Sequence, residues 1–80
     1  MAENVQEWLK QGIEAAREGR KDEAREYFQK VVEQDEHNER GWFWLASLVE
    51  TDEEKLICLK NVVQINPGNE RAQKALVQLE

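Results

Sequence analysis

Apolar residues recur along the chain at the three- and four-residue spacing of an amphipathic helix, and no stretch shows a sustained strand-like period of two. Polar and turn-forming residues interrupt this pattern, so the sequence predicts an all-α fold of five short helices. They are expected at about residues 5–18, 21–34, 39–49, 52–65 and 70–80. Because the connections between them are short, neighbouring helices should run antiparallel.

Residues that commonly begin or end helices mark these boundaries. Asn4 and Thr51 are each followed three residues later by a glutamate, the spacing of a capping box. Asn38 is expected to cap the third helix in a similar way. Gly19 is the expected end of the first helix, because glycine readily adopts the left-handed conformation that often occurs there.

The second half of the chain repeats the first. The segment KVVEQDEHNER, which begins at Lys30, aligns without gaps on NVVQINPGNER, which begins at Asn61, at an offset of 31 residues. Trp8 and Trp42 lie 34 residues apart, so the second unit is shorter by three residues in its internal turn. Self-similarity at this period is typical of helical repeat proteins, in which stacked helix pairs bury a common core.

Both units also match the signature positions of one repeat family. These residues are Trp8, Gly12, Gly19, Ala24 and Phe28 in the first unit, Trp42, Leu45, Ala46, Leu59 and Pro67 in the second, and Leu76 in the last helix. On these positions the chain resembles the tetratricopeptide repeat family, whose unit is a helix–turn–helix of 34 residues. The resemblance implies a right-handed α-solenoid that forms a single domain over residues 1–80. Its parts would be one repeat at about 5–38, a second at about 39–69 and a capping helix at about 70–80.

Composition restricts the classes of partner. The 80 residues carry a formal net charge of −6. This charge argues against nucleic acid, because its binding relies on neutralising phosphates with Lys and Arg. No apolar run is long enough for membrane insertion, so a cytoplasmic location is expected.

Residues that could perform chemistry are few and scattered. His37 is the only histidine and lies in a polar turn, and Cys58 is the only cysteine and is expected to be a small packing residue. The acidic runs that begin at Asp35 and Asp52 fall at turns and helix starts, which explains them better than a metal site does. We therefore expect no enzyme activity, no catalytic residue, no cofactor and no metal ion.

The family resemblance implies a concave groove for a peptide or protein segment, lined by the first helix of each pair and by the capping helix. The residues that map onto this groove are Lys10, Ile13, Arg17, Arg40, Phe43, Trp44, Ser47, Arg71, Lys74 and Gln78, together with Gln6 and Leu9. Five of them are basic, and no acidic residue is expected in the groove before Glu50 at its rim. This bias favours an acidic peptide as the partner. The alternative is that the Lys and Arg side chains only solvate the helix faces.

Three consecutive aromatic residues bear on the same question. Trp42 matches Trp8 in the repeat and is expected to lie in the core against the fourth helix. Phe43 is assigned to the groove floor, as is the part of Trp44 that does not pack on the preceding helix pair. Two functions stay open: a binding module that presents this groove, and an assembly element. In the second, neighbouring repeats or a second copy in a homodimer would cover Phe43 and Trp44.

Overall fold

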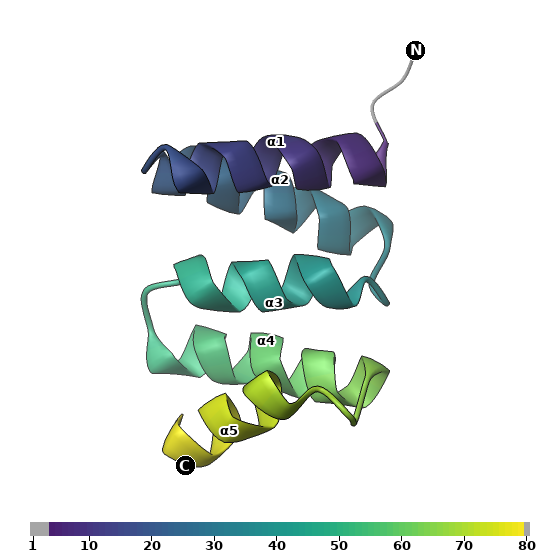
Figure 1. The fold of residues 1–80 in the computed structure, drawn as a ribbon, viewed down its shortest axis with the longest axis vertical. Coiled ribbons are helices and arrows are strands. Elements are labelled where there is room, and N and C mark those ends of the chain that lie inside the picture. Colours follow the sequence, from purple (N-terminus) through teal and green to yellow (C-terminus); the bar gives the residue numbers. More distant parts are fainter. Residues whose placement is uncertain (1–3, 80) are drawn as a thin grey trace.

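A computed structural model describes residues 4–79, and these form five α-helices without any β-strand (Figure 1). The helices are α1 (Val5–Arg17), α2 (Lys21–Gln34), α3 (Glu39–Leu48), α4 (Asp52–Ile65) and α5 (Glu70–Leu79). The predicted all-α fold of five short helices is confirmed, and consecutive helices run antiparallel. Residues 1–3 and 80 of the predicted domain lie outside the described residues.

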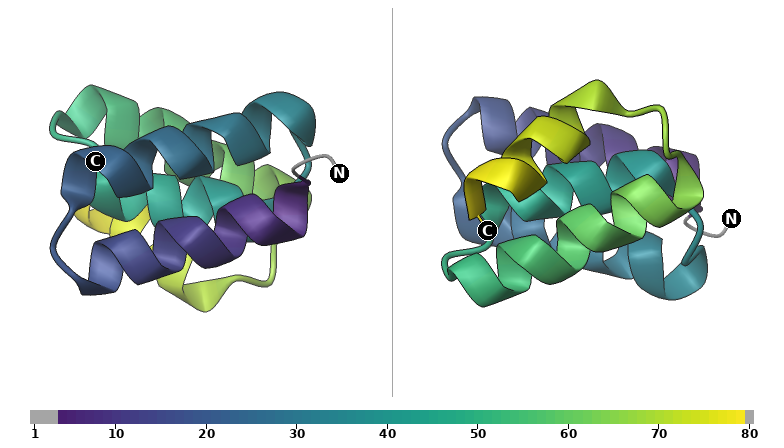
Figure 2. Two further views of the ribbon diagram at one scale, coloured as in Figure 1. Left: turned by 90° about the horizontal axis from the view of Figure 1, so that it is seen from above. Right: turned by 90° about the horizontal axis from the view of Figure 1, so that it is seen from below.

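The helices form a stack in chain order. Each packs mainly on the helix before it and the helix after it, and the stack measures 41 × 24 × 17 Å. Seen along its long axis, α1 and α5 lie on one side, α2 and α4 lie on the other, and α3 lies between them (Figure 2). The molecule therefore has two different lateral faces, both of which include part of α3.

Side-chain caps begin four of the five helices. Asn4, Asn38, Thr51 and Asn69 each accept a hydrogen bond from the backbone N–H three residues later, at 2.8–3.1 Å. The N–H groups of the first turn have no partner within the helix, so each cap satisfies one of them. The caps predicted at Asn4, Asn38 and Thr51 are confirmed.

The turn between α1 and α2 depends on Gly19. Its φ angle is +81°, in the left-handed region that glycine adopts without steric cost. The Gly19 N–H donates to the Ala16 carbonyl at 3.2 Å, and the Arg20 N–H donates to the Ala15 carbonyl at 2.8 Å. These bonds satisfy carbonyls at the end of α1, as expected of a helix that ends before a glycine.

Phe28 joins three helices. Phe28 belongs to α2, and its side chain is fully buried. Its ring lies so close to α1 that a Cβ at Gly12 would be 2.8–3.0 Å from the ring atoms. The ring also stacks on Trp44 of α3, with centroids 5.4 Å apart and planes 8° apart. Phe28 therefore links the first helix pair to the second, and only a residue without a side chain fits opposite it on α1.

A second close approach joins α2 to α3 near the start of α3. A Cβ at Gly41 would lie 2.7 Å from Val31 Cγ1 and 3.1 Å from Val32 Cγ1. Val31 and Val32 are buried, and their branched side chains have little rotamer freedom in a helix. The small residue at position 41 thus sets how near the two helix pairs can lie.

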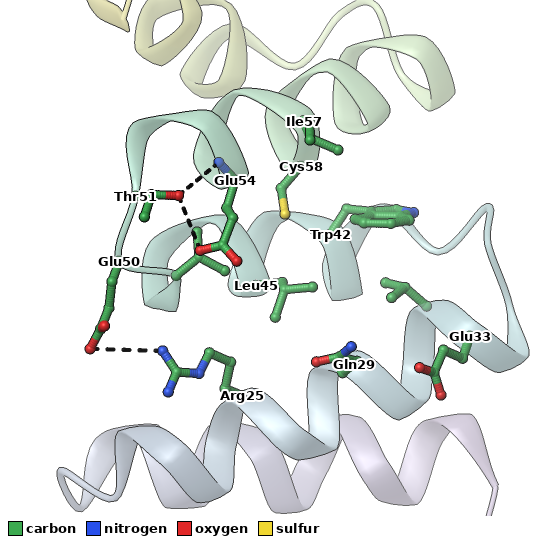
Figure 3. A pocket seen from close by; sticks show the side chains of 12 residues that line it. Arg25, Gln29, Glu33, Trp42, Leu45, Glu50, Thr51, Glu54, Ile57 and Cys58 are labelled. Atoms are coloured by element: carbon green, nitrogen blue, oxygen red, sulfur yellow. Dashed lines mark hydrogen bonds and ion pairs between the residues drawn. The ribbon is translucent and has the colours of Figure 1, made fainter.

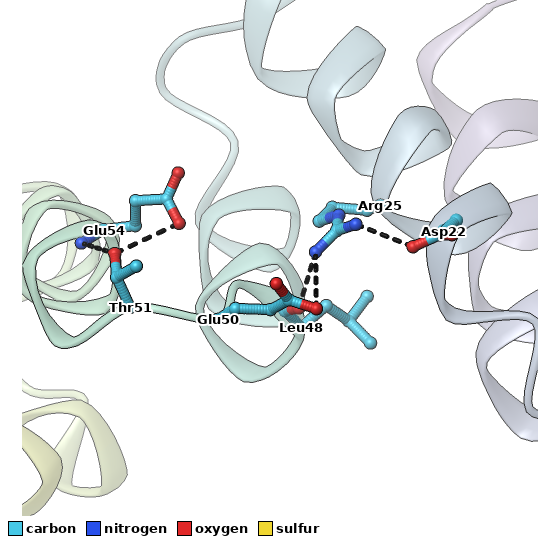
Figure 4. Close-up of polar contacts among 6 residues, drawn as sticks. All are labelled: Asp22, Arg25, Leu48, Glu50, Thr51 and Glu54. Carbon is cyan, nitrogen blue, oxygen red and sulfur yellow. Dashed lines mark hydrogen bonds and ion pairs between the residues drawn. The ribbon is translucent and has the colours of Figure 1, made fainter.

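Arg25 connects α2 to the far end of α3 (Figure 4). Its guanidinium contacts Asp22 Oδ1 at 2.7 Å, the Leu48 carbonyl at 3.4 Å and Glu50 Oε2 at 4.0 Å. The Leu48 carbonyl is one of those left without a partner at the helix C-terminus, where a positive charge is favourable.

Glu39 connects the start of α3 to the turn between α4 and α5. Its carboxylate accepts hydrogen bonds from the side-chain amides of Asn66, at 3.0 and 3.2 Å, and of Asn69, at 2.6 Å. Asn69 also caps α5 through its Oδ1 atom. One carboxylate therefore orients the residue that begins the last helix.

We expect Gly12→Ala to lower the free energy of unfolding by about 1–2 kcal/mol. Alanine favours a helix by up to about 1 kcal/mol over glycine, but overpacking a core costs about 1–3 kcal/mol. Here the Phe28 ring cannot retreat, because Trp44 stacks against it. Urea denaturation followed by circular dichroism measures the change. Gly68→Ala is the matched control, because its Cβ would meet only Asn66 Oδ1, at 3.4 Å. A Gly12→Ala variant as stable as the parent would contradict the close approach.

We expect Glu39→Ala to lower the free energy of unfolding by about 1 kcal/mol more than Glu70→Ala does, because it removes the acceptor for two amides. Both residues lie in the first turn of a helix, so the favourable effect of a negative charge there is lost in both variants. The same urea titration measures the difference. Equal losses in the two variants would show that the bonds to Asn66 and Asn69 contribute nothing.

Candidate functional site

A hollow of about 480 Å³ lies between α1 and the start of α3. It is lined by Gln6, Leu9, Lys10, Ile13, Glu14, Arg17 and Arg40. We call it the α1/α3 hollow. All but one of its residues belong to the groove that the sequence predicts.

The helical period brings these side chains together. Lys10, Ile13 and Arg17 recur at intervals of three and four residues and so share one face of α1. Leu9 is 6% exposed and Ile13 is partly buried, so they form an apolar floor. Arg40 lies in the first turn of α3 and adds a charge from the second helix pair.

The charge of the hollow is opposite to that of the whole chain. Lys10, Arg17 and Arg40 are exposed, and none forms an ion pair with another described residue. Glu14 is the single carboxylate in the lining. The prediction that the groove contains no acidic residue before Glu50 is therefore wrong. Glu14 lies four residues after Lys10 on the same helix, and this spacing alone would have placed it beside the groove.

The three predicted groove residues at the centre of α3 do not line the hollow. Trp44 is partly buried and stacks on Phe28, so this face of its ring belongs to the packing between the helix pairs. Phe43 is partly buried against the core, and the Ser47 hydroxyl donates to the Trp44 carbonyl at 2.7 Å. The predicted contact of Trp44 with the preceding pair is confirmed.

The predicted groove residues of α5 lie at the opposite end of the stack from α1 (Figure 1). Lys74 and Gln78 line a shallow hollow of about 670 Å³ together with three other residues of α5. Arg71 is exposed and lines neither this hollow nor the α1/α3 hollow. The ten predicted residues thus occupy separate places along the stack instead of one cavity.

Trp42 is less buried than predicted. It packs against the core but is only partly buried, and its indole N–H donates to the Glu36 carbonyl at 2.8 Å. Trp8, its counterpart in the first unit, is also partly buried. The two tryptophans are therefore buried to a similar degree, as the repeat predicts, but neither is fully buried in the core. A side chain as large as tryptophan seldom loses all contact with solvent.

The residues that could perform chemistry are separated. Cys58 is buried as predicted, and burial together with the nearby negative charge of Glu54 raises the pKa of its thiol to about 11. Such a thiol stays protonated near neutral pH and is a poor nucleophile. His37 is exposed, and its backbone N–H donates to Asp35 Oδ1 at 3.2 Å. Within residues 4–79 no three His, Cys, Asp or Glu side chains are grouped as a metal site.

No helix in the described part of the chain is both long enough and apolar enough to cross a membrane.

Comparison with known proteins gave a family match and no match to any curated protein. Residues 5–38, which span α1, α2 and the turn that follows, match the family model of the tetratricopeptide repeat. These bounds coincide with the predicted first repeat, and α3 and α4 form a second antiparallel helix pair that packs on the first. Residues 5–38 are therefore assigned to the tetratricopeptide repeat family, as the signature residues of the first unit predict.

Proposed function

We propose that this protein is a non-catalytic binding module and that its α1/α3 hollow holds an acidic segment of a partner protein. Tetratricopeptide repeats in general mediate protein–protein interactions. The observation that carries the finer proposal is the set of three basic side chains without ion-pair partners around an apolar floor, in a chain of net charge −6. Charge complementarity of this kind selects between partners and sets their orientation.

The hollow is basic but the whole chain is acidic, and this restricts which acidic segments bind well. At physiological ionic strength charges more than about 8–10 Å apart are largely screened, so the distant carboxylates repel only weakly. Lys10, Arg17 and Arg40 are in direct contact range of a bound segment and are screened less. The apolar floor at Leu9 and Ile13 can accept one apolar side chain. We therefore propose a short segment with carboxylates on both sides of an apolar residue.

Arg40→Glu is expected to weaken binding of an acidic peptide about fivefold, because each exposed charge pair contributes up to about 1 kcal/mol. The probe is a labelled peptide with Asp and Glu around one Leu, measured by fluorescence anisotropy. An Asn/Gln version and a Lys version of the peptide serve as comparisons.

Lys60→Glu is the matched control for this variant. Lys60 is exposed on α4 and does not line the hollow, and its reversal changes the net charge by the same amount. Binding to Lys60→Glu should equal binding to the parent. The proposal fails if the acidic peptide binds no better than the neutral one, or if the two variants lose the same affinity.

Self-association is a second candidate function, and one exposed residue on α5 favours it. Val77 is 73% exposed, whereas Ala46, its counterpart one repeat earlier, is 3% exposed and packed in the core. A second copy packed on α5 would cover Val77. Light scattering over a range of protein concentrations tests this: self-association requires a mass that rises with concentration, and Val77→Glu should then stay monomeric.

A further inference from the structure

A second surface hollow, of about 580 Å³, lies on the other side of the stack from α1 and α5 (Figures 2 and 3). It is lined by residues of α2, α3 and α4 and of the connection between α3 and α4, with α2 and α4 on its two sides. We call it the α2/α4 groove. Of the residues discussed for the predicted groove, only Glu50, which was expected at its rim, lines this one, because the sequence placed the binding surface on the first helix of each pair and on the capping helix.

The floor of the α2/α4 groove is apolar. Val32, Leu45 and Cys58 are between 5% and 7% exposed and form its deepest part. Trp42 closes one end, and the hydrogen bond from its indole N–H to the Glu36 carbonyl holds the orientation of its ring (Figure 3). The face that remains accessible within the groove is therefore apolar, whereas the polar edge of the ring is already satisfied.

Ile57 extends this apolar surface to the lip of the groove. Its side chain is 59% exposed, and it lines the groove from α4. A single exposed isoleucine is common on soluble proteins and carries no functional meaning by itself. At position 57 it is continuous with the apolar floor, so a partner that fills the groove would also cover it.

The rim of the groove is acidic. Glu33, Glu50 and Glu54 line it, and Arg25 is the only cation in the lining. The Arg25 guanidinium is already held by Asp22 at 2.7 Å and lies 4.0 Å from Glu50. Among the described residues no cation forms an ion pair with Glu33 or Glu54. The charge around this groove is thus opposite in sign to that around the α1/α3 hollow.

The backbone around the groove restricts the shape of a partner. The walls and most of the floor are helical, so their N–H and C=O groups are hydrogen-bonded within the helices. The carbonyl of Leu48, at the end of α3, accepts a hydrogen bond from Arg25. An extended peptide would find few backbone partners here, whereas a helix satisfies its own backbone and needs only side-chain contacts. Two parallel helices above an apolar floor therefore suit a third helix laid between them.

We propose that the α2/α4 groove binds an amphipathic helix of a partner protein, with apolar residues facing the floor and Lys or Arg residues facing the acidic rim. The net charge of −6 has the same sign as the rim, so the distant charges, which are largely screened at physiological ionic strength, do not oppose such a helix. This site is separate from the α1/α3 hollow and takes a partner of opposite charge.

The test uses three designed helical peptides of about 16 residues each. The first has Leu at positions i, i+3, i+4 and i+7, with Lys along both edges of this apolar face. The second has Glu in place of Lys, and the third has the composition of the first in an order that removes the apolar face. Isothermal titration calorimetry with the whole chain should show binding of the first peptide at least tenfold tighter than that of the other two. Equal affinity of the first and third peptides would mean attraction by charge alone and would overturn the proposal.

Ile57→Glu separates apolar docking from charge. This change adds a negative charge to the rim, so a purely electrostatic site would bind the Lys peptide more tightly. We expect instead at least a tenfold loss, because the apolar lip is removed. Val77→Glu makes the same kind of change at a second exposed apolar residue within the described part of the chain, on α5, and should leave the affinity unchanged. The comparison is made at a concentration at which all the proteins are monomeric, and equal affinities of the two variants would overturn the proposal.

Glu33→Lys tests the acidic rim, with Glu26→Lys as its control on the same helix. Glu26 is exposed and does not line the groove, so only the first variant should weaken binding of the Lys peptide, about threefold to fivefold. Arg40→Glu should leave this binding unchanged, and Ile57→Glu should leave the binding of the acidic peptide to the α1/α3 hollow unchanged. The two sites can therefore fail independently. A loss of Lys-peptide binding in both Glu33→Lys and Glu26→Lys would assign the effect to net charge and contradict a docking site.

Discussion

The contact of Phe28 with Gly12 on one side and Trp44 on the other is the constraint on which the rest of the structure depends. In a linear stack each helix touches mainly its neighbours, so stability is a sum of repeats and of the interfaces between them. This chain has one complete interface between two helix pairs, and the Phe28 ring lies within it. The packing at this interface therefore fixes where the α1/α5 side and the α2/α4 side of the stack lie relative to each other.

The stack separates charges that would otherwise be mixed on a helical surface. Basic side chains without ion-pair partners surround the α1/α3 hollow, while carboxylates outnumber the single arginine around the α2/α4 groove. The difference follows from the alternation of the helices, because α1 and α2 lie on opposite sides of α3 and each lines a different surface. Two surfaces of opposite sign on one small domain discriminate between partners by repulsion as well as by attraction.

Features set by local sequence were predictable, and features set by distant contacts were not. The caps at Asn4 and Thr51 involve residues three positions apart, so the sequence alone indicates them. The bonds from Asn66 and Asn69 to Glu39 span 27 and 30 residues, and no periodic pattern indicates them. The residues of α1 that line the α1/α3 hollow, such as Lys10, Ile13 and Arg17, share one face because of the helical period. The α2/α4 groove depends instead on how far α2 and α4 lie apart across α3, which only the packed structure defines.

Helix α3 contributes to both surfaces, with Arg40 in the hollow and with Trp42 and Leu45 in the groove. The hollow crosses from α1 to α3, and the groove crosses from α2 to α4, so each spans the interface between the two helix pairs. An occupant of either surface would therefore stabilise the same interface. Because linkage is reciprocal, any ordering of that interface by one partner lowers the cost of binding the other. The interface that holds Phe28 is thus the physical element through which two partners on opposite faces would influence each other.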